Sequence, residues 1–277
     1  MHKILTTDYQ SSQFGSNFTT SLKNTGFAVI KNHPISNQLI NQIYDEWETF
    51  FNSHFKNNYL FHKVKQDGYF PYLSENAKGY TAKDLKEFFH IYDWGRYPSE
   101  ISDKTNELVN EFKIMAEKLL FEIQKNTSSE ITDKFSVSLD QMIQKSQENL
   151  LRIIHYPPLL GNEDSGAIRA GAHEDINLIT LLLSGTQPGL QVKTKENKWV
   201  DVKSDSGWLI INIGDMLQEC SGGYYPSTTH RVINPKGSNV SRYSMPFFVH
   251  ARDEVILSEK YTAKSYLEER LKEIGLK

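Results

Sequence analysis

The sequence contains little of what marks secreted, membrane-spanning or nucleic-acid-binding proteins. Its single cysteine, Cys220, rules out an intrachain disulfide, so a reducing cytoplasm is the expected location. No apolar run approaches the roughly 20 residues that cross a bilayer, and the N-terminus has no signal-peptide core. We therefore expect a cytoplasmic protein without a membrane partner.

Neither sign of charge dominates the chain. It has 31 Lys and Arg against 34 Asp and Glu, a net charge of −3, and the two signs are interspersed. A protein that binds nucleic acid electrostatically would normally carry a basic patch, so we expect no nucleic-acid partner. The near-neutral surface, without an added recognition module, favours a small-molecule substrate. The sequence does not predict the oligomeric state.

The length and composition fit one domain. The 277 residues, 38% hydrophobic and 23% charged, can bury one sizeable core. No internal repeat or low-complexity linker divides the chain. We expect a single domain over residues 1–277, with a mainly helical region at 1–148 and a β-rich core at 149–277.

Apolar residues at helical spacing predict the helices of the N-terminal region. Ser36 is suited to be the N-cap of the first. The run 26–31 suits a strand, and the aromatic-rich stretch 67–93, broken by Gly and Pro, is expected to be irregular. The predicted helices cover about 36–51, 102–125 and 139–145.

The pattern changes at about residue 149. Short apolar runs alternate with Gly, Asn, Pro, Asp and Ser, which is typical of a β-sandwich or jelly roll. Gly214 and Asp215 are expected to form a turn, and the tail at 263–276 a closing amphipathic helix. The fold class is thus mainly β with helical additions. The expected strands cover 150–156, 178–183, 190–194, 199–202, 208–213, 229–233 and 242–250.

Two histidines and one aspartate form the most informative pattern. His173 and Asp175 are two residues apart, so both can reach one ion from a strand end or the turn after it. With His230, about 57 residues later, they form the H-x-D…H ligand set of a facial triad on non-haem Fe(II). Taken alone, His173 and Asp175 also fit a surface turn capped by Asp175.

A second pair follows a dozen residues after His230. Arg242 and Ser244 are two residues apart, so they share one face of a strand. The planar guanidinium fork of Arg242 fits a carboxylate, and the Ser244 hydroxyl can donate to the same group. A surface ion pair is the alternative role for Arg242.

The sequence around these residues resembles the isopenicillin N synthase-like branch of the Fe(II)/2-oxoglutarate-dependent dioxygenases. The resemblance spans most of the chain, in the family's order. The matching segments are GFAVIKNH at 26–33, LRIIHYPP at 151–158, AHED at 172–175, GLQV at 189–192, WV at 199–200, NIGDMLQ at 212–218, STTHRV at 227–232 and RYS at 242–244.

This resemblance implies both a fold and a reaction. The fold is a double-stranded β-helix, or jelly roll, buttressed by N-terminal helices and a C-terminal helix. Fe(II), held by His173, Asp175 and His230, would use O2 and the co-substrate 2-oxoglutarate, with no catalytic side chain beyond the metal ligands. Decarboxylation of 2-oxoglutarate to succinate and CO2 would drive hydroxylation of the substrate; desaturation and ring closure are variants.

The family pattern also assigns contacts for the co-substrate. The distal carboxylate of 2-oxoglutarate would lie against Arg242 and Ser244. Tyr156 matches the tyrosine of the family's Tyr-Pro-Pro stretch and would add a third donor. Many plant relatives have Asn where this chain has Ile154, so one family contact to the co-substrate is absent here.

Arg152 and Phe248 are candidates for binding the prime substrate. Arg152 shares a strand face with Tyr156, and Phe248 shares one with Ser244. Arg152 could bind a carboxylate of the substrate, and it is equally suited to a structural role at the strand edge.

Three other functions remain open. One is an oxidase of the isopenicillin N synthase type, which uses Fe(II) and O2 without a keto acid. The second is a metal-binding jelly-roll protein without turnover. The third is a hydroxylase of a protein or another macromolecule. Formation of succinate separates the main prediction from the first two.

Overall fold

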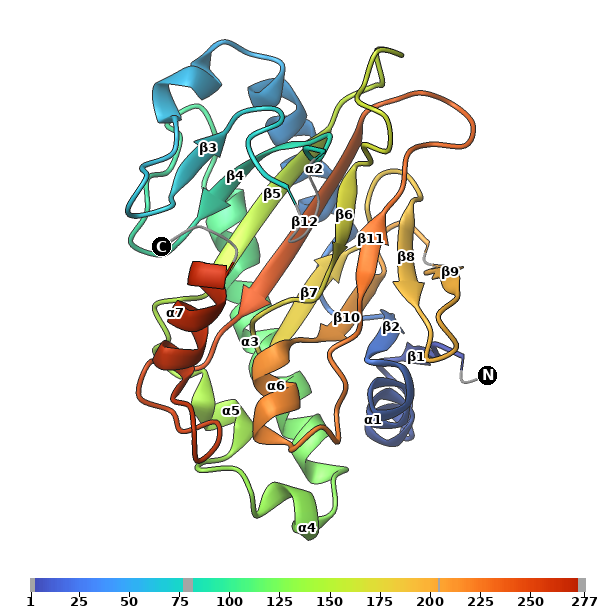
Figure 1. Cartoon of the computed structure of the whole chain (residues 1–277), viewed down its shortest axis with the longest axis vertical. Coiled ribbons are helices and arrows are strands. Elements are labelled where there is room, and N and C mark those ends of the chain that lie inside the picture. Colours follow the sequence, from blue (N-terminus) through green and yellow to red (C-terminus); the bar gives the residue numbers. More distant parts are fainter. Residues whose placement is uncertain (1–2, 77–81, 204, 274–277) are drawn as a thin grey trace.

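The structure, a computed structural model, describes residues 3–76, 82–203 and 205–273 and consists of two facing β-sheets with flanking helices (Figure 1). The larger sheet has eight strands in the order β1-β2-β10-β7-β12-β5-β4-β3, and the smaller has four in the order β6-β11-β8-β9. The strands are β1 Thr6–Asp8, β2 Phe27–Lys31, β3 Gly68–Phe70, β4 Glu87–Ile91, β5 Leu150–Tyr156, β6 Ala170–His173, β7 Ile179–Leu183, β8 Leu190–Lys193, β9 Trp199–Asp201, β10 Leu209–Ile213, β11 His230–Val232 and β12 Arg242–Val249.

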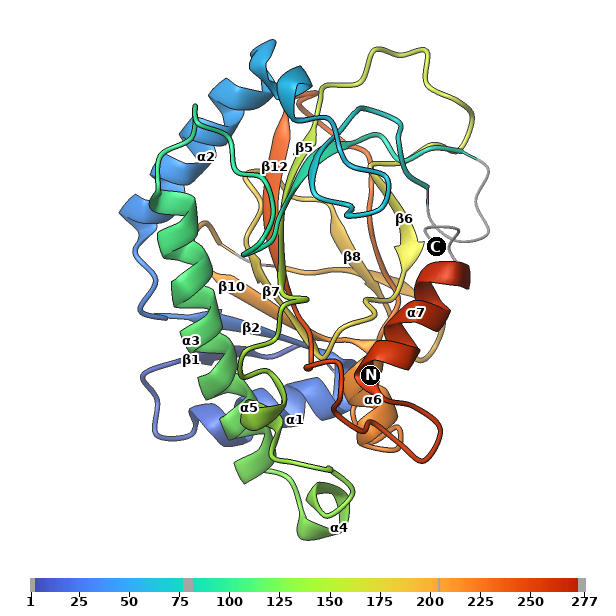
Figure 2. The same ribbon diagram turned by 90° about the vertical axis from the view of Figure 1, so that its left-hand side faces the viewer.

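Helices α1, α2 and α3 cover the outer face of the larger sheet, and β6 and β8 of the smaller sheet lie on its other side (Figure 2). The helices are α1 Phe14–Thr25, α2 Asn37–Phe51, α3 Lys104–Lys125, α4 Ser129–Thr132, α5 Leu139–Met142, α6 Asp215–Cys220 and α7 Ala263–Glu273, with a 3-10 turn at Phe55–Tyr59. Among the described residues, no helix combines the length and apolar composition needed to span a bilayer.

Strand alternation divides the core into two parts. In β5, Leu151 and Ile153 pack against the helices, whereas Ile154 and Tyr156 point into the space between the two sheets. The outer part is large and aromatic, and its centre is Trp47 of α2, which is fully buried. Burial of each large apolar side chain in this part of the core contributes about 1.5–3 kcal/mol to the free energy of unfolding. The inner part is smaller, and its polar positions form the functional site.

Most predicted elements of the β-rich region are confirmed within a residue or two. The expected strand 150–156 is β5, and 242–250 is β12 without its last residue. The jelly-roll prediction is confirmed, because two β-sheets face each other across the inner part of the core. The tail helix is α7, although the predicted end at 274–276 lies outside the described residues.

The helical predictions are also largely confirmed. Ser36 is the N-cap of α2, and its hydroxyl accepts a hydrogen bond from the Leu39 N–H at 3.5 Å. The predicted 102–125 helix is α3, whereas 139–145 forms only the short helix α5. The predicted turn at Gly214 and Asp215 is wrong, because Gly214 is the N-cap of α6.

The expectation that 67–93 is irregular is wrong at both ends. β3 and β4 pair with each other, and β4 pairs with β5 in the larger sheet. Phe88 packs in the inner part of the core and Phe89 in the outer part, as neighbouring residues of a strand do. The middle of this stretch, 77–81, lies outside the described residues.

Candidate metal centre and co-substrate site

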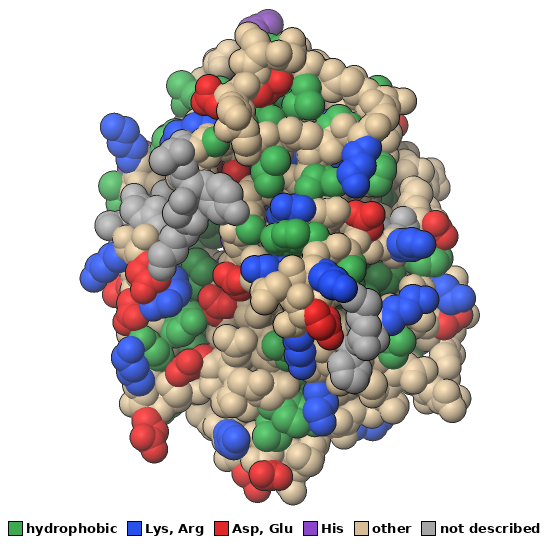
Figure 3. Space-filling model, turned by 45° about the vertical axis from the view of Figure 1, so that its right-hand side comes forward, with side chains coloured by type: hydrophobic (Ala, Val, Ile, Leu, Met, Phe, Trp, Pro, Cys, Tyr) green, Lys and Arg blue, Asp and Glu red, His purple; other side chains and the backbone are tan. Residues whose placement is uncertain are grey.

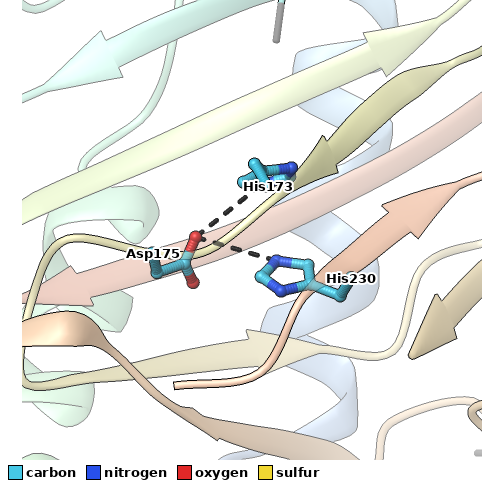
Figure 4. Close-up of side chains that lie close together, drawn as sticks. All are labelled: His173, Asp175 and His230. Carbon is cyan, nitrogen blue, oxygen red and sulfur yellow. Dashed lines mark ion pairs between the residues drawn. The ribbon is translucent and has the colours of Figure 1, made fainter. Parts of the chain in front are cut away.

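The two histidines of the H-x-D…H pattern are direct neighbours in the smaller sheet. β11 and β6 are antiparallel, and His230 lies opposite His173 in their register. Their ring centroids are 4.4 Å apart. β6 ends at His173, so Asp175 lies just past the strand end and turns its carboxylate toward both rings (Figure 4).

The three ligand atoms converge on one point. Asp175 Oδ1 is 3.7 Å from His173 Nε2 and 3.7 Å from His230 Nε2. One ligand atom from each of the three residues lies within 4.8 Å of the other two. The structure thus brings together the three residues that the sequence predicted as metal ligands.

Backbone hydrogen bonds fix the orientation of both imidazoles. His173 Nδ1 is 2.8 Å from the Gly171 carbonyl, and His230 Nδ1 is 3.1 Å from the Thr228 carbonyl. A carbonyl only accepts, so each Nδ1 carries a proton, and in the neutral ring each Nε2 then presents its lone pair to the shared point. This is the usual way in which proteins orient metal-binding histidines.

Asp175 is held equally firmly. Its Oδ2 accepts hydrogen bonds from the Thr180 hydroxyl at 2.6 Å and the Asn212 amide at 2.8 Å, which leaves Oδ1 for a metal. Burial alone would raise the pKa of this carboxyl, but attraction to His230 and His173 and these hydrogen bonds outweigh burial and lower the pKa. Asp175 is therefore ionised at neutral pH.

His173 is kept in the form that a metal requires. Burial lowers its pKa, and repulsion from His230 lowers it further. Two neutral imidazole nitrogens and one carboxylate oxygen on one side of an ion fit Fe(II) and leave its other positions open. When bound there, Fe(II) would supply the binding and reduction of O2. The protein's own part is to orient the ligands and exclude other reactions.

Arg242 lies across the inner face from this site, on β12. It is buried, its Nε donates to the Gln187 carbonyl at 2.9 Å, and its Nη1 has no hydrogen-bond partner among the described residues. Its guanidinium carbon is 5.0 Å from the centre of the Tyr156 ring, directly across the β12–β5 pair. Gly185 permits this placement, because a Cβ at that residue would lie 2.6 Å from Arg242 Nη2.

The other two predicted co-substrate residues lie on the same face. Ser244 is buried two residues along β12 from Arg242, opposite Ile154 of β5. Tyr156 is buried beside Arg242. Together these side chains offer a carboxylate an unpaired guanidinium N–H and two hydroxyl groups.

Arg152 points into the same interior and is already engaged. Its Nε donates to His90 Nε2 at 2.8 Å, and its Nη1 is 3.2 Å from Glu75 Oε2. The same Glu75 oxygen is 2.8 Å from Lys86 Nζ. The Arg152 guanidinium lies 4.3 Å from the centre of the Phe88 ring and 5.7 Å from that of Phe248, so both predicted substrate residues are in contact.

Sequence reasoning missed residues that support the ligands from other elements. Asp84 Oδ1 accepts the Gly171 N–H at 2.9 Å, and the Gly171 carbonyl orients His173, so Asp84 is connected to the metal ligand through the backbone of one residue. Asp84 Oδ2 in turn accepts from Lys86 at 2.8 Å. No motif links residue 84 to residue 173, and only the folded chain brings them together. Arg169 was also missed: it directly precedes β6, and the register of β6 shifts between Ala170 and His173, so its position relative to His173 does not follow from residue spacing.

The fold and the site define a class. A jelly roll with two histidines and one aspartate at a strand end, and a buried arginine across the interior, is the arrangement of a mononuclear non-haem iron oxygenase.

Comparison with known proteins identifies the family. The sequence profile of the 2OG-Fe(II) oxygenase superfamily matches residues 147–251, and that of the "non-haem dioxygenase in morphine synthesis N-terminal" region matches 3–112. A Shewanella oneidensis protein described as an oxygenase is 49% identical, with 99% of each chain covered and a TM-score of 0.90. The chain therefore belongs to the 2OG-Fe(II) oxygenase superfamily, whose members use Fe(II), 2-oxoglutarate and O2.

More distant relatives agree. A "2-oxoglutarate-Fe(II) type oxidoreductase" of Aspergillus fumigatus is 28% identical over 81% of this chain and 72% of its own length. The "Feruloyl CoA ortho-hydroxylase 1" of Arabidopsis thaliana is 29% identical over 84% of this chain and 64% of its own length. The chain thus spans roughly two thirds to three quarters of these relatives.

Proposed function

We propose that this 2-oxoglutarate-dependent oxygenase hydroxylates a small-molecule substrate. The observation that carries the proposal is the placement of Asp175 Oδ1 at 3.7 Å from both imidazole Nε2 atoms, with every other polar atom of these side chains hydrogen-bonded elsewhere. The hydroxylase among the relatives supports hydroxylation over desaturation or ring closure.

In this proposal each residue has a defined role. His173, Asp175 and His230 hold Fe(II), and Arg242 binds the distal carboxylate of 2-oxoglutarate. Ser244 and Tyr156 donate hydrogen bonds to that carboxylate. The unpartnered Nη1 of Arg242 supports this role, because a buried donor without an acceptor is costly unless a ligand supplies one.

We assign the prime substrate to the side of the interior formed by Arg152 and Phe248. The contact of the Arg152 guanidinium with the Phe88 and Phe248 rings supports this assignment, because it combines a cation with flat apolar surfaces. Arg152 would bind an acidic group of the substrate, which would take the position that Glu75 Oε2 has beside Arg152 and Lys86.

We also propose that residues 1–277 act as one oxygenase domain in the cytoplasm. The pairing of β2 with β10 and of β4 with β5 supports a single domain, because it joins the two halves of the chain in one sheet. The lone cysteine is buried, and Figure 3 shows basic and acidic side chains interspersed on one face, with none of the single-sign character of a nucleic-acid or membrane surface there. Both observations are consistent with a cytoplasmic enzyme of small molecules.

A metabolite panel tests this function. The protein with Fe(II), 2-oxoglutarate and O2 is incubated with each compound, and succinate release is compared with a control without added compound. The expected result is that at least one small acid stimulates succinate release and gains one oxygen atom from labelled O2. A product that has lost two hydrogens without gaining oxygen would replace hydroxylation by desaturation or ring closure. Stimulation by a protein substrate alone would contradict the proposal.

A further inference from the structure

Arg169 is a buried arginine for which the metal site and the predicted co-substrate contacts leave no role. Only 1% of the residue is exposed. Its Nη2 donates to the Val240 carbonyl at 2.8 Å, and its Nε has no hydrogen-bond partner among the described residues. A fully buried guanidinium with an unused N–H is a costly feature unless a ligand completes it.

The position of Arg169 relates it to Arg242. Arg169 directly precedes β6, and Val240, which it contacts, is two residues before Arg242 of β12. A second contact ties the same two segments, since the Asn234 amide donates to the Ala167 carbonyl at 2.9 Å. Arg169 is therefore held at the Arg242 end of the interior.

Both arginines lie against one aromatic ring. The guanidinium carbon of Arg169 is 5.9 Å from the centre of the Tyr156 ring, and that of Arg242 is 5.0 Å from it. Burial lowers the pKa of Arg169, and the positive charge of Arg242 lowers it further. An arginine remains protonated even so, and the two cations share one buried site.

Within the described part of the chain, no carboxylate compensates these charges. Among the described residues, neither Arg169 nor Arg242 forms a salt bridge with any Asp or Glu. Lys86, another buried cation of this interior, is by contrast paired, because it contacts both Glu75 and Asp84 at 2.8 Å. Two buried and unpaired guanidinium groups, each with a free N–H, form a site for an anion that the protein does not itself supply.

We propose that Arg169 is a second arginine of the co-substrate site and binds the distal carboxylate of 2-oxoglutarate together with Arg242. This inference rests on the function proposed above. Arg242 Nη1 and Arg169 Nε would each donate to the carboxylate, beside the Tyr156 ring that both guanidinium groups approach. The site would therefore favour a keto acid with a second carboxylate, and Arg169 would determine this specificity without touching the metal-binding end.

The test compares two keto acids that differ only at the distal end. 2-Oxoglutarate carries the distal carboxylate, and 2-oxobutanoate has the same chelating end without it. Binding to the Fe(II) protein is measured without O2 by charge-transfer absorbance, so no turnover is needed. Arg169→Leu should weaken 2-oxoglutarate binding by at least roughly tenfold, the loss of one charge-assisted contact, and leave 2-oxobutanoate binding within about twofold of wild type.

Matched variants keep the test decisive. Arg169→Gln removes the charge but can still donate to Val240, so it should repeat the result if Arg169→Leu does not fold. Arg270→Leu is the control, because Arg270 Nε is also unpartnered but Glu269 and Glu273 lie 2.6 and 2.7 Å from its Nη2; its affinities should match wild type.

The outcomes separate this inference from the function on which it rests. If wild type binds 2-oxoglutarate and both Arg169 variants bind it equally well, Arg169 has no role in co-substrate binding and the inference is overturned. An equal loss for both keto acids would also overturn it, because that pattern indicates a structural role through Val240. If wild type itself shows no 2-oxoglutarate binding, the co-substrate assignment fails and the inference with it.

Discussion

His230 and His173 lie directly opposite each other in the antiparallel pair of β11 and β6. Residues that are opposite in a sheet project from the same face, so this register alone brings two imidazoles from distant parts of the sequence to one point. The carboxylate of Asp175 meets them from beyond the strand end at 3.7 Å. A shift of one residue in this register would turn one histidine to the opposite face and abolish the site.

The first prediction concerns metal binding. His230→Ala removes one of the three metal ligands. Loss of a residue that only hydrogen-bonds to a ligand already lowers metal affinity by roughly 10–100-fold, so the Fe(II) affinity of this variant should fall by more than that. Turnover should be lost while the fold is kept. Anaerobic isothermal titration measures the affinity, with His54→Ala, an exposed histidine, as the control. Unchanged Fe(II) binding by the His230 variant would remove this residue from the metal site.

The second prediction concerns the co-substrate. Arg242→Ala should weaken 2-oxoglutarate binding by at least roughly tenfold, because it removes a charge-assisted contact in a buried site. Iron binding should survive. Arg242→Lys keeps the charge but not the planar fork, so it should recover only part of the affinity. A charge-transfer titration with 2-oxoglutarate that matches wild type in the alanine variant would rule out this role.

The third prediction separates substrate from co-substrate. Arg152→Leu and Phe248→Ala should keep slow conversion of 2-oxoglutarate to succinate without substrate, because neither residue contacts the metal ligands. They should lose the acceleration that the true substrate brings, since an error of about 1 Å in position can cost roughly a hundredfold in rate. Phe121→Ala, an exposed phenylalanine of α3, is the control. Full coupling in both variants would show that the substrate binds elsewhere.

The fourth prediction concerns stability and pH. Glu87 is buried and accepts hydrogen bonds from Lys56 at 2.9 Å, from His155 at 2.7 Å and from the Tyr69 hydroxyl. Burial alone would raise its pKa, but these hydrogen bonds outweigh burial and lower the pKa below the ordinary value of 4.5. Because the folded pKa is depressed, the ionised network stabilises the fold fully above pH 4.5, and this contribution disappears as the pH falls through the folded pKa.

Glu87→Gln tests this dependence. The variant should lose about 1–3 kcal/mol of unfolding free energy at neutral pH, the cost of breaking a buried charged hydrogen-bond network. The difference from wild type should shrink as the pH falls below the ordinary pKa of glutamate, because the wild-type carboxyl is then protonated as well. Urea unfolding at a series of pH values measures both quantities. A difference that stays constant into acid would show that the charge of Glu87 does not stabilise the fold.

The sequence predicts the β-rich half of the fold well because its strands are short apolar runs separated by turn residues. The strand Leu150–Tyr156, for example, is followed at once by Pro157 and Pro158, and both of its faces are buried. β3 and β4 lack such a signal. Their strand character comes from pairing with each other and with β5, which lies about 60 residues further on, so it depends on contacts that local patterns do not carry.

The sequence likewise predicts one part of the site and not the other. The ligands His173, Asp175 and His230 follow from residue type and spacing, because the metal requires those groups. The residues that orient them do not follow in this way: Asp84 accepts from the Gly171 N–H, the Gly171 carbonyl accepts from His173, and no motif connects residue 84 with residue 173. Arg169 does not follow from spacing either, because the register of β6 shifts between Ala170 and His173, and its unpaired charge is visible only in the folded chain.

Succinate formation from 2-oxoglutarate distinguishes a keto-acid-dependent oxygenase from the alternatives. Wild type is loaded with Fe(II) and 2-oxoglutarate without O2, and succinate is quantified after O2 is admitted. We expect succinate and CO2 in equal amounts, dependent on both Fe(II) and O2, and no succinate from Asp175→Ala. Consumption of O2 that requires Fe(II) but yields no succinate would rule out this reaction and indicate an oxidase without a keto acid. Iron binding with no O2 consumption across the substrate panel would indicate a metal-binding protein without turnover.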